Sequence, residues 1–308
     1  MIAVAEGLHK LNTEQQNVRS AHIDTLTTLE TVALINDEDH LCAEAVKAVL
    51  PEVARSVDAI YEKMRNGGRL FYCGAGTSGR LGALDAAECP PTFGVDYETV
   101  IALIAGGETA FFRAVEGAED NREQGAVDLQ KHGFCACDVL VGIAASGRTP
   151  YVIGAMDYAK TLGATVIALV CCKGSEMQQH ADITIAPLPG PEVITGSTRM
   201  KSGTCQKMVL NMLSTAVMVK HGKVYGNLMA DVKASNEKLM HRAVQIVCTA
   251  TGETQETAKR ALAQCDYHCK TAIVMLLLNL DAQAARDLLQ KADGHIAAAL
   301  RIFNGGDA

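Results

Sequence analysis

Three features that assign many chains to a class are missing from this sequence. No apolar run reaches the roughly 18 residues of a membrane-spanning helix, and the longest candidate, 272–278, reads as part of a buried helix. Basic residues are not in excess, since the net charge is −7, which argues against a nucleic-acid partner. The eleven cysteines include no Cys-x-x-Cys pair, and the nine histidines have no ligand spacing. The sequence therefore indicates no membrane segment, no nucleic-acid partner and no metal site.

The N-terminus also lacks a basic segment followed by an apolar one, which a secretory signal would require. Scattered cysteines without a pairing pattern agree with this, so we expect a cytoplasmic protein whose thiols are reduced. Apolar residues make up 48% and charged residues 20% of the 308 positions, as in an ordinary globular protein. That length suffices for one large α/β domain and a smaller unit.

The segment 69–91 is the most informative part of the chain. It opens with a short apolar stretch that predicts a buried strand, continues with a glycine-rich turn at 74–80, and then shows helical spacing. A strand, a glycine turn and a helix N-terminus together make an anion site, because backbone N–H groups and the helix dipole favour a phosphate there. The hydroxyl groups of Thr77 and Ser78 add donors to this predicted site.

The turn 74–79 also matches Gly-x-Gly-x-x-Gly, the pattern of dinucleotide-binding sites. Such a site requires an acidic residue at the end of the second strand, about 20 residues further on. Here the second predicted strand ends at 105–107, and Glu108 comes late, after a glycine pair. A nicotinamide or flavin site is therefore not favoured, and we expect no cofactor.

A second turn of similar composition, 144–150, follows the third predicted strand. In the strand order 2-1-3-4-5 the first and third strands are neighbours, so both turns meet where open parallel sheets bind ligands. This predicts that Ser146, Arg148 and Thr149 bind the same phosphate as the first turn. The alternative is that both segments are ordinary strand–helix turns.

A third segment, 190–204, precedes the last predicted helix of the sheet domain. Ser197 or Thr198 is the expected N-cap residue of that helix, and Ser197 is also expected to contact the substrate. Two basic residues follow, Arg199 and Lys201, and they are expected to face either an anion or solvent.

The chain divides into three predicted parts. Residues 1–40 are polar and weakly periodic, which predicts a surface arm with one short helix. Residues 41–221 begin with an amphipathic helical region that is broken or started at Pro51, and strands and helices then alternate. This predicts an α/β domain with a parallel sheet flanked by helices on both faces. We expect five strands in it, in the order 2-1-3-4-5. Residues 222–308 predict a small all-helical C-terminal unit. Strands are expected near 70–73, 98–104, 138–144, 164–170 and 182–186, and helices near 79–88, 109–131, 149–162, 174–180 and 199–221.

Six segments spread along the chain carry a resemblance to a known family. They are 74–91, 105–108, 114–120, 142–151, 190–204 and 234–239. The chain resembles the N-acetylmuramic acid 6-phosphate etherases, a family with a sugar-isomerase (SIS) fold that is related to the glucokinase regulatory protein. The resemblance extends from Ile23 to the helical tail, so it covers nearly the whole chain.

The resemblance implies a carbon–oxygen lyase that cleaves the D-lactyl ether of N-acetylmuramate 6-phosphate. The implied products are N-acetylglucosamine 6-phosphate and D-lactate, in the recycling of peptidoglycan amino sugars, and the implied assembly is a homodimer. The implied mechanism opens the sugar ring so that the C2 proton becomes acidic, eliminates lactate from C3, and adds water there. Such a scheme needs a base, an acid and no metal.

The family's two catalytic glutamates correspond to Glu88, the acid, and Glu119, the base. The sequence gives separate support for Glu88, because Pro90 predicts that the helix ends there, and a helix C-terminus disfavours a negative charge. Without the resemblance, Glu88 reads as a solvated carboxylate. Glu119 lies in an acidic run, 116–123, which by itself reads as a solvated face. Only the resemblance selects Glu119 from that run.

Two other functions use the same fold. One is a non-catalytic sugar-phosphate sensor, like the glucokinase regulatory protein, and the other is an aldose–ketose isomerase of phosphosugars. Release of lactate from N-acetylmuramate 6-phosphate would separate the etherase from both.

Overall fold

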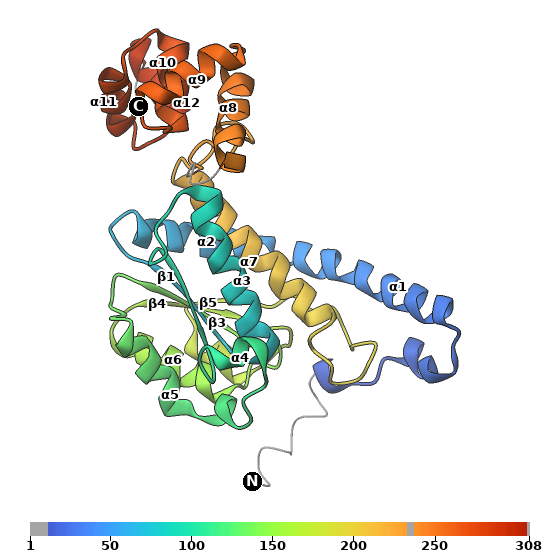
Figure 1. Cartoon of the computed structure of the whole chain (residues 1–308). Coiled ribbons are helices and arrows are strands. Elements are labelled where there is room, and N and C mark those ends of the chain that lie inside the picture. Colours follow the sequence, from blue (N-terminus) through green and yellow to red (C-terminus); the bar gives the residue numbers. More distant parts are fainter. Residues whose placement is uncertain (1–11, 233–236, 307–308) are drawn as a thin grey trace. The chain divides into compact units, whose positions relative to one another are not determined.

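The computed structural model describes residues 12–232 and 237–306, and it divides into two compact units (Figure 1). The larger unit comprises the described residues up to Ala87 together with Glu98–Ser214. The smaller unit comprises Glu88–Tyr97 and the described residues from Thr215 onward. The boundaries near residues 40 and 221 that the sequence suggests stay a prediction.

The larger unit is built on a five-stranded parallel sheet. Its order is β2-β1-β3-β4-β5, so the predicted fold class and strand order are confirmed. Gly74, the last residue of β1, pairs with Ile104 on one side and with Ile143 on the other. The carboxyl ends of β1, β2 and β3 therefore lie side by side at one edge of the sheet. The strands are β1 (Leu70–Gly74), β2 (Val100–Ile104), β3 (Val139–Ile143), β4 (Thr165–Leu169) and β5 (Ile183–Ile185).

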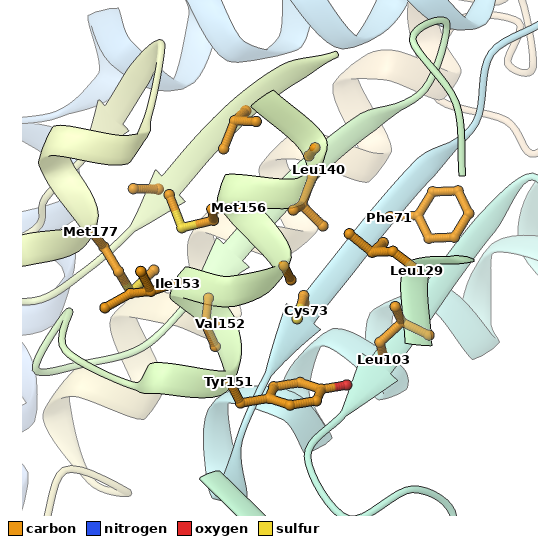
Figure 2. Close-up of a cluster of buried hydrophobic side chains, with 14 of the residues drawn as sticks. Phe71, Cys73, Leu103, Leu129, Leu140, Tyr151, Val152, Ile153, Met156 and Met177 are labelled. Carbon is orange, nitrogen blue, oxygen red and sulfur yellow. The ribbon is translucent and has the colours of Figure 1, made fainter. Parts of the chain in front are cut away.

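Helices cover both faces of the sheet, because successive strand residues point to opposite faces and are apolar on each of them. One face packs against α5 (Arg122–Lys131) and α6 (Pro150–Thr161), as Figure 2 shows. The opposite face carries Tyr72, whose hydroxyl donates to Asp85 of α3 (Gly76–Phe93) at 2.9 Å. Asp85 also accepts from Asn211 of α7 (Lys201–Lys220) at 2.8 Å. The side chains drawn in Figure 2 include Phe71, Cys73, Leu103, Leu129, Leu140, Tyr151, Val152, Ile153, Met156 and Met177.

From residue 12 onward, where the structure describes the chain, the N-terminal region is more helical than the sequence suggests. Instead of one short helix, it contains α1 (Thr28–Lys47), 20 residues long, before α2 (Leu50–Met64). Thr27 and Glu30 form a capping box at the start of α1. Apolar periodicity does not predict this helix, because few of its side chains are buried and one of those is the carboxylate of Glu38.

Two helices of the sheet domain have unexpected limits. The helix α3 (Gly76–Phe93) does not end near Glu88 but continues through Pro90 and Pro91, and the N–H group of Gly94 still donates to Pro90 O at 3.0 Å. The segment expected as one helix, 109–131, is instead α4 (Thr109–Phe112), a 3₁₀ turn η5 (Ala118–Asp120) and α5. Gly117, with a φ of 72°, breaks the helix before η5.

The expected helix at 174–180 is a 3₁₀ helix, η6 (Glu176–His180), and the last helix of the sheet domain is α7 (Lys201–Lys220). The smaller unit is all-helical in its described part, as predicted. Its helices are α8 (Glu237–Thr251), α9 (Gln255–Gln264), α10 (Cys269–Leu278), α11 (Ala282–Lys291) and α12 (Ile296–Phe303). Among the described residues, no helix combines the length and the apolar character needed to cross a membrane.

Candidate functional site

The glycine-rich turn after β1 is tighter than the sequence suggests, since α3 already begins at Gly76. An added Cβ at Gly74 would lie 2.7 Å from Gly79 N, and one at Gly79 would lie 2.7 Å from Cγ1 of Ile104. Only glycine fits at these two positions, because the chain folds directly back over the strand end. Thr77 and Ser78 therefore lie in the first turn of α3, where backbone N–H groups are free of intrahelical partners.

The hydroxyl group of Ser78 faces α7. Ser78 is buried, and its Oγ donates a hydrogen bond of 2.9 Å to Oε1 of Gln206. Thr77 is partly buried. It lies beside the same helix, since a Cβ added at Gly203 of α7 would be 3.5 Å from Cγ2 of Thr77. The first turn of α3 is thus enclosed by the sheet edge on one side and by α7 on the other.

The second predicted loop leaves β3, the strand next to β1, and enters α6. Ser146, Arg148 and Thr149 are all partly buried there, and Thr149 is the N-cap residue of α6 without a capping bond from its side chain. Gly147 has a φ of 61°, and an added Cβ would lie 2.3 Å from Ser175 Oγ. The structure therefore brings the two loops to neighbouring strand ends, as the strand order predicted.

The third predicted segment differs from expectation at the start of α7. The expected N-cap residues, Ser197 and Thr198, precede the helix by several residues. The carboxylate of Glu192 caps it instead, accepting from the N–H groups of Lys201 and Ser202, each at 2.9 Å. A carboxylate satisfies two orphan donors at once and complements the helix dipole, which explains the preference.

Lys201 faces an anion, one of the two expected alternatives, but the anion is the carboxylate of Glu38 in the protein itself. Lys201 is buried, and its Nζ donates to Glu38 Oε2 at 2.6 Å and to Pro189 O at 2.9 Å. Glu38 accepts further hydrogen bonds from Asn17 at 2.7 Å and Arg19 at 2.8 Å. Burial opposes ionisation of Glu38, but the hydrogen bonds from Lys201 and Asn17 and the charges of Lys201 and Arg19 together lower its pKa. This network ties α1 to α7.

A cavity of about 220 Å³ lies on the β2 side of the first loop, at the carboxyl edge of the sheet. It is bounded by the β1 loop and the start of α3 on one side and by the segment after β2 on the other. Glu119, on the 3₁₀ turn η5, is exposed and lines this cavity. The lining residues are Ala75, Gly76, Arg80, Ala105, Ala110, Ala114, Val115, Glu116, Gly117, Ala118 and Glu119.

The position of Glu88 does not match the reasoning from sequence. Glu88 lies within α3, more than a turn before its end at Phe93, and its side chain is exposed. The argument from a helix C-terminus therefore does not apply to it. By its contacts Glu88 belongs to the smaller unit, whereas Glu119 belongs to the larger one.

Family models match most of the chain. A model of the N-terminal SIS domain of glucokinase regulatory protein matches residues 52–160, and a model of the SIS domain matches residues 136–216. A model of the C-terminal lid domain of glucokinase regulatory protein matches residues 226–272.

Curated relatives match nearly the full length. The chain is 59% identical over 289 residues to an N-acetylmuramic acid 6-phosphate etherase of Photorhabdus laumondii, covering 94% of this chain and 96% of the relative. It is 57% identical over 293 residues to that of Aliivibrio fischeri, covering 95% and 98%. The chain belongs to the N-acetylmuramic acid 6-phosphate etherase family. The etherase of Klebsiella aerogenes is a further relative, 56% identical over 293 residues.

Three residues of this etherase-family site were not singled out from the sequence. Arg80 lines the cavity, Gln206 contacts Ser78, and Glu192 caps α7. Arg80 could have been noticed as the one basic residue of the glycine-rich turn. Gln206 and Glu192 had no such signal, because each acts on a partner that only the fold brings near.

Proposed function

We propose that this chain is an N-acetylmuramic acid 6-phosphate etherase, which cleaves the D-lactyl ether of that sugar. The products are N-acetylglucosamine 6-phosphate and D-lactate, so the enzyme is a carbon–oxygen lyase of peptidoglycan amino-sugar recycling. The observation that carries the proposal is the identity of 56–59% to etherases over nearly the whole chain. The site supports it, because the loop after β1, which leads to Thr77 and Ser78, lines a cavity that also contains the carboxylate of Glu119.

The phosphate is assigned to the two loops at the ends of β1 and β3. Thr77, Ser78, Ser146 and Thr149 supply hydroxyl groups, and the first turns of α3 and α6 supply backbone N–H groups. Arg148 adds a positive charge beside Ser146. Ser197 is assigned to the substrate by the family resemblance.

The reaction avoids direct displacement at the ether, whose leaving group would be an alkoxide. Opening the sugar ring makes C1 an aldehyde, so the C2 proton becomes acidic. A base removes that proton, an acid protonates the lactate oxygen as the C3–O bond breaks, and water then adds to C3. The sum is one ether and one water converted into two alcohols, with no change in oxidation state and no need for a cofactor.

The two carboxyl groups are assigned as base and acid. Glu119 is the base, because it lines the cavity next to the loop that is assigned to the phosphate. Glu88 is the acid, an assignment that rests on its correspondence to the family's second catalytic glutamate.

A homodimer is part of the proposal. The face of α1 that carries Leu29 and Val32 leaves these side chains 77% and 53% exposed, which is unusual for neighbouring apolar residues on one helix. A second copy of the chain would cover them. We also expect the enzyme to act in the cytoplasm.

A sugar-phosphate sensor is the second candidate, because two of the family models describe glucokinase regulatory protein. The test is incubation of the purified protein with N-acetylmuramate 6-phosphate in ¹⁸O-labelled water. The etherase is expected to release D-lactate, with the label in the C3 hydroxyl group of the sugar. A sensor would bind the sugar phosphate without releasing lactate, and label in lactate would contradict the elimination.

A further inference from the structure

Arg80 is the only basic residue among those that line the cavity in the described part of the chain. Around it the walls are mostly alanine and glycine, with two carboxylates, those of Glu116 and Glu119. The described lining of the cavity therefore has one positively charged side chain, in the same cavity as the carboxylate that is assigned as the base.

The guanidinium group of Arg80 is held in place by one of its five donors. Its Nε donates to the carbonyl oxygen of Phe111 at 3.0 Å, which joins the second turn of α3 to α4. Within the described residues, the two Nη groups have no hydrogen-bond or ion-pair partner, even though Glu116 and Glu119 line the same cavity. An oriented guanidinium whose two outer nitrogens are free is suited to a bidentate anion.

The substrate of the proposed reaction has two anionic groups, the 6-phosphate and the carboxylate of the lactyl ether. Ser78 and Arg80 point away from each other, since Ser78 contacts α7 and Arg80 contacts α4. We propose that Arg80 forms the carboxylate subsite, where its two Nη groups bind the lactyl carboxylate; the proposal rests on the etherase function above. The phosphate then occupies the loops, and the sugar lies between the two anionic groups.

This subsite would do more than add affinity. A lactyl carboxylate near Glu119 would repel the base, and the guanidinium offsets that repulsion. It also orients the ether oxygen relative to the C2–H bond that Glu119 must reach. Arg80 is therefore a residue that distinguishes the substrate from the product, because the product sugar has the phosphate but no carboxylate.

The experiment compares Arg80→Gln and Arg80→Lys with the unchanged enzyme. Calorimetry in a Glu119→Gln background measures binding of N-acetylmuramate 6-phosphate and of N-acetylglucosamine 6-phosphate without turnover. We expect Arg80→Gln to weaken binding of N-acetylmuramate 6-phosphate by about 10- to 100-fold, as for a lost charged hydrogen bond. Its effect on binding of N-acetylglucosamine 6-phosphate should be less than about twofold. Arg80→Lys keeps the positive charge but lacks the planar guanidinium group that can donate two parallel hydrogen bonds. Its affinity for N-acetylmuramate 6-phosphate should therefore lie between those of Arg80→Gln and the unchanged enzyme.

The matched control is Arg113→Gln, since Arg113, the C-cap residue of α4, is an exposed arginine that does not line the cavity. It should leave both affinities unchanged. Equal weakening of both sugars by Arg80→Gln would assign Arg80 to the phosphate and overturn the proposal, as would no effect on either. Failure of the proposed function is a separate result, namely that the unchanged chain releases no lactate.

A second inference comes from a pair of cysteines at the opposite edge of the sheet. Cys135 and Cys137 are exposed, in contrast to eight buried cysteines, and their Sγ atoms lie 2.6 Å apart. They precede β3, so they lie at the amino ends of the strands, away from the cavity.

The loop around this pair is anchored on both sides. Asp138 is buried and accepts from Cys135 N at 3.0 Å and from Arg69 Nη2 at 2.9 Å, and Lys63 Nζ donates to Ala136 O at 2.8 Å. Both oxygens of Asp138 are thus engaged, which leaves only two thiols for a metal ion. Two sulfur atoms this close to each other suit a disulfide bond. In a metal site the sulfur atoms must leave room for the ion between them.

We infer that Cys135 and Cys137 form a reversible disulfide by exchange with a small disulfide such as glutathione disulfide. One thiolate attacks the reagent and releases a glutathione thiolate, giving a mixed disulfide. The neighbouring thiolate then attacks the protein sulfur of that bond and releases the second glutathione. The two thiols are oxidised, two protons are lost, and one glutathione disulfide is reduced to two thiols.

The test treats the reduced chain with glutathione disulfide and analyses the peptide that contains both cysteines by mass spectrometry. We expect loss of two hydrogens with no glutathione retained, and reversal by dithiothreitol. Cys137→Ser should instead retain one glutathione on Cys135, and Cys248→Ser, which changes the one half-buried cysteine, should behave like the unchanged chain. Stable glutathione on both cysteines, no reaction, or protection by a tightly bound metal ion would overturn the inference.

Discussion

Ser78 and Gln206 are joined by a hydrogen bond of 2.9 Å between the first turn of α3 and the second turn of α7. Gln206 is 1% exposed, and its Nε2 has no hydrogen-bond partner in the described part of the chain. In this arrangement the hydroxyl proton of Ser78 is used by the glutamine. Rotation of the amide by half a turn would let Nε2 donate to Ser78 Oγ, and the serine proton would then be free to bind a phosphate oxygen.

Replacement of Gln206 should therefore affect phosphate binding without direct contact to the reacting carbons. We expect Gln206→Leu to weaken binding of N-acetylglucosamine 6-phosphate by roughly tenfold, about the value of one net hydrogen bond. Gln206→Glu should weaken it further, because a carboxylate only accepts and would keep the serine proton. Calorimetry measures both, and unchanged affinity in the two variants would show that Gln206 does not position Ser78.

The assignment of the phosphate to the two loops predicts the effect of removing their hydroxyl groups. Ser78→Ala or Ser146→Ala should weaken substrate binding by about 1–3 kcal/mol, the value of a hydrogen bond to a charged group. Thr161→Val is the control, since its exposed hydroxyl group lies at the far end of α6. The loop assignment is wrong if both serine variants bind the substrate as tightly as the unchanged chain.

An isotope experiment should distinguish the roles of Glu88 and Glu119. Glu119→Gln is expected to abolish exchange of the C2 proton with deuterated water as well as turnover. Glu88→Gln should still permit exchange while lactate release falls, each loss being ~10²–10⁴-fold. NMR of the sugar follows the exchange.

A matched variant in the same acidic run is Glu123→Gln, which changes an exposed residue outside the cavity and should retain activity. Exchange lost in Glu88→Gln but kept in Glu119→Gln would reverse the two roles. Full activity in either variant would remove that residue from the mechanism.

The smaller unit should lose stability in acid through Asp231. This carboxylate is close to Lys223 at 2.8 Å, Lys270 at 3.0 Å and His268 at 3.2 Å. Burial opposes its ionisation, but the hydrogen bond from His268 and the charges and hydrogen bonds of the two lysines hold its pKa well below the usual range. Because the folded pKa is below the unfolded value, the stabilisation is complete above about pH 4 and is lost as the pH falls below it.

Asp231→Asn tests this linkage, since it leaves Lys270 buried without its partner. We expect the variant to be less stable by roughly 3–5 kcal/mol at pH 7, with a smaller difference at pH 3. Urea unfolding of both proteins at the two pH values gives the comparison. A difference that does not change with pH would mean that the charge of Asp231 is not what stabilises the unit.

The exposed apolar face of α1 predicts that the chain self-associates. Sedimentation should give about twice the chain mass of 32.7 kDa at micromolar concentration. Leu29→Asp combined with Val32→Asp should shift the protein to the monomer, because both substitutions would place charges in a buried contact. A monomer in the unchanged chain would contradict the proposed dimer.

The sequence alone determined the sheet and the two loops. Short, mainly apolar stretches that alternate with helical segments predicted every strand, and the strand order placed the turns at 74–80 and 144–150 at neighbouring strand ends. These features are local, because a buried parallel strand is continuously apolar and a tight turn requires glycine at particular positions. The family motifs selected Glu119 and Glu88, which local patterns would have left as solvated carboxylates.

Only the tertiary structure decided where charged and polar residues of the site lie. Glu38 and Lys201 are 163 positions apart in sequence, and each is buried only because the other is present. Gln206 and Arg80 also have partners from distant segments, namely Ser78 and the carbonyl oxygen of Phe111. A charged side chain follows no period in the sequence when its environment is set by a partner on another element, so patterns find the strands but not these contacts.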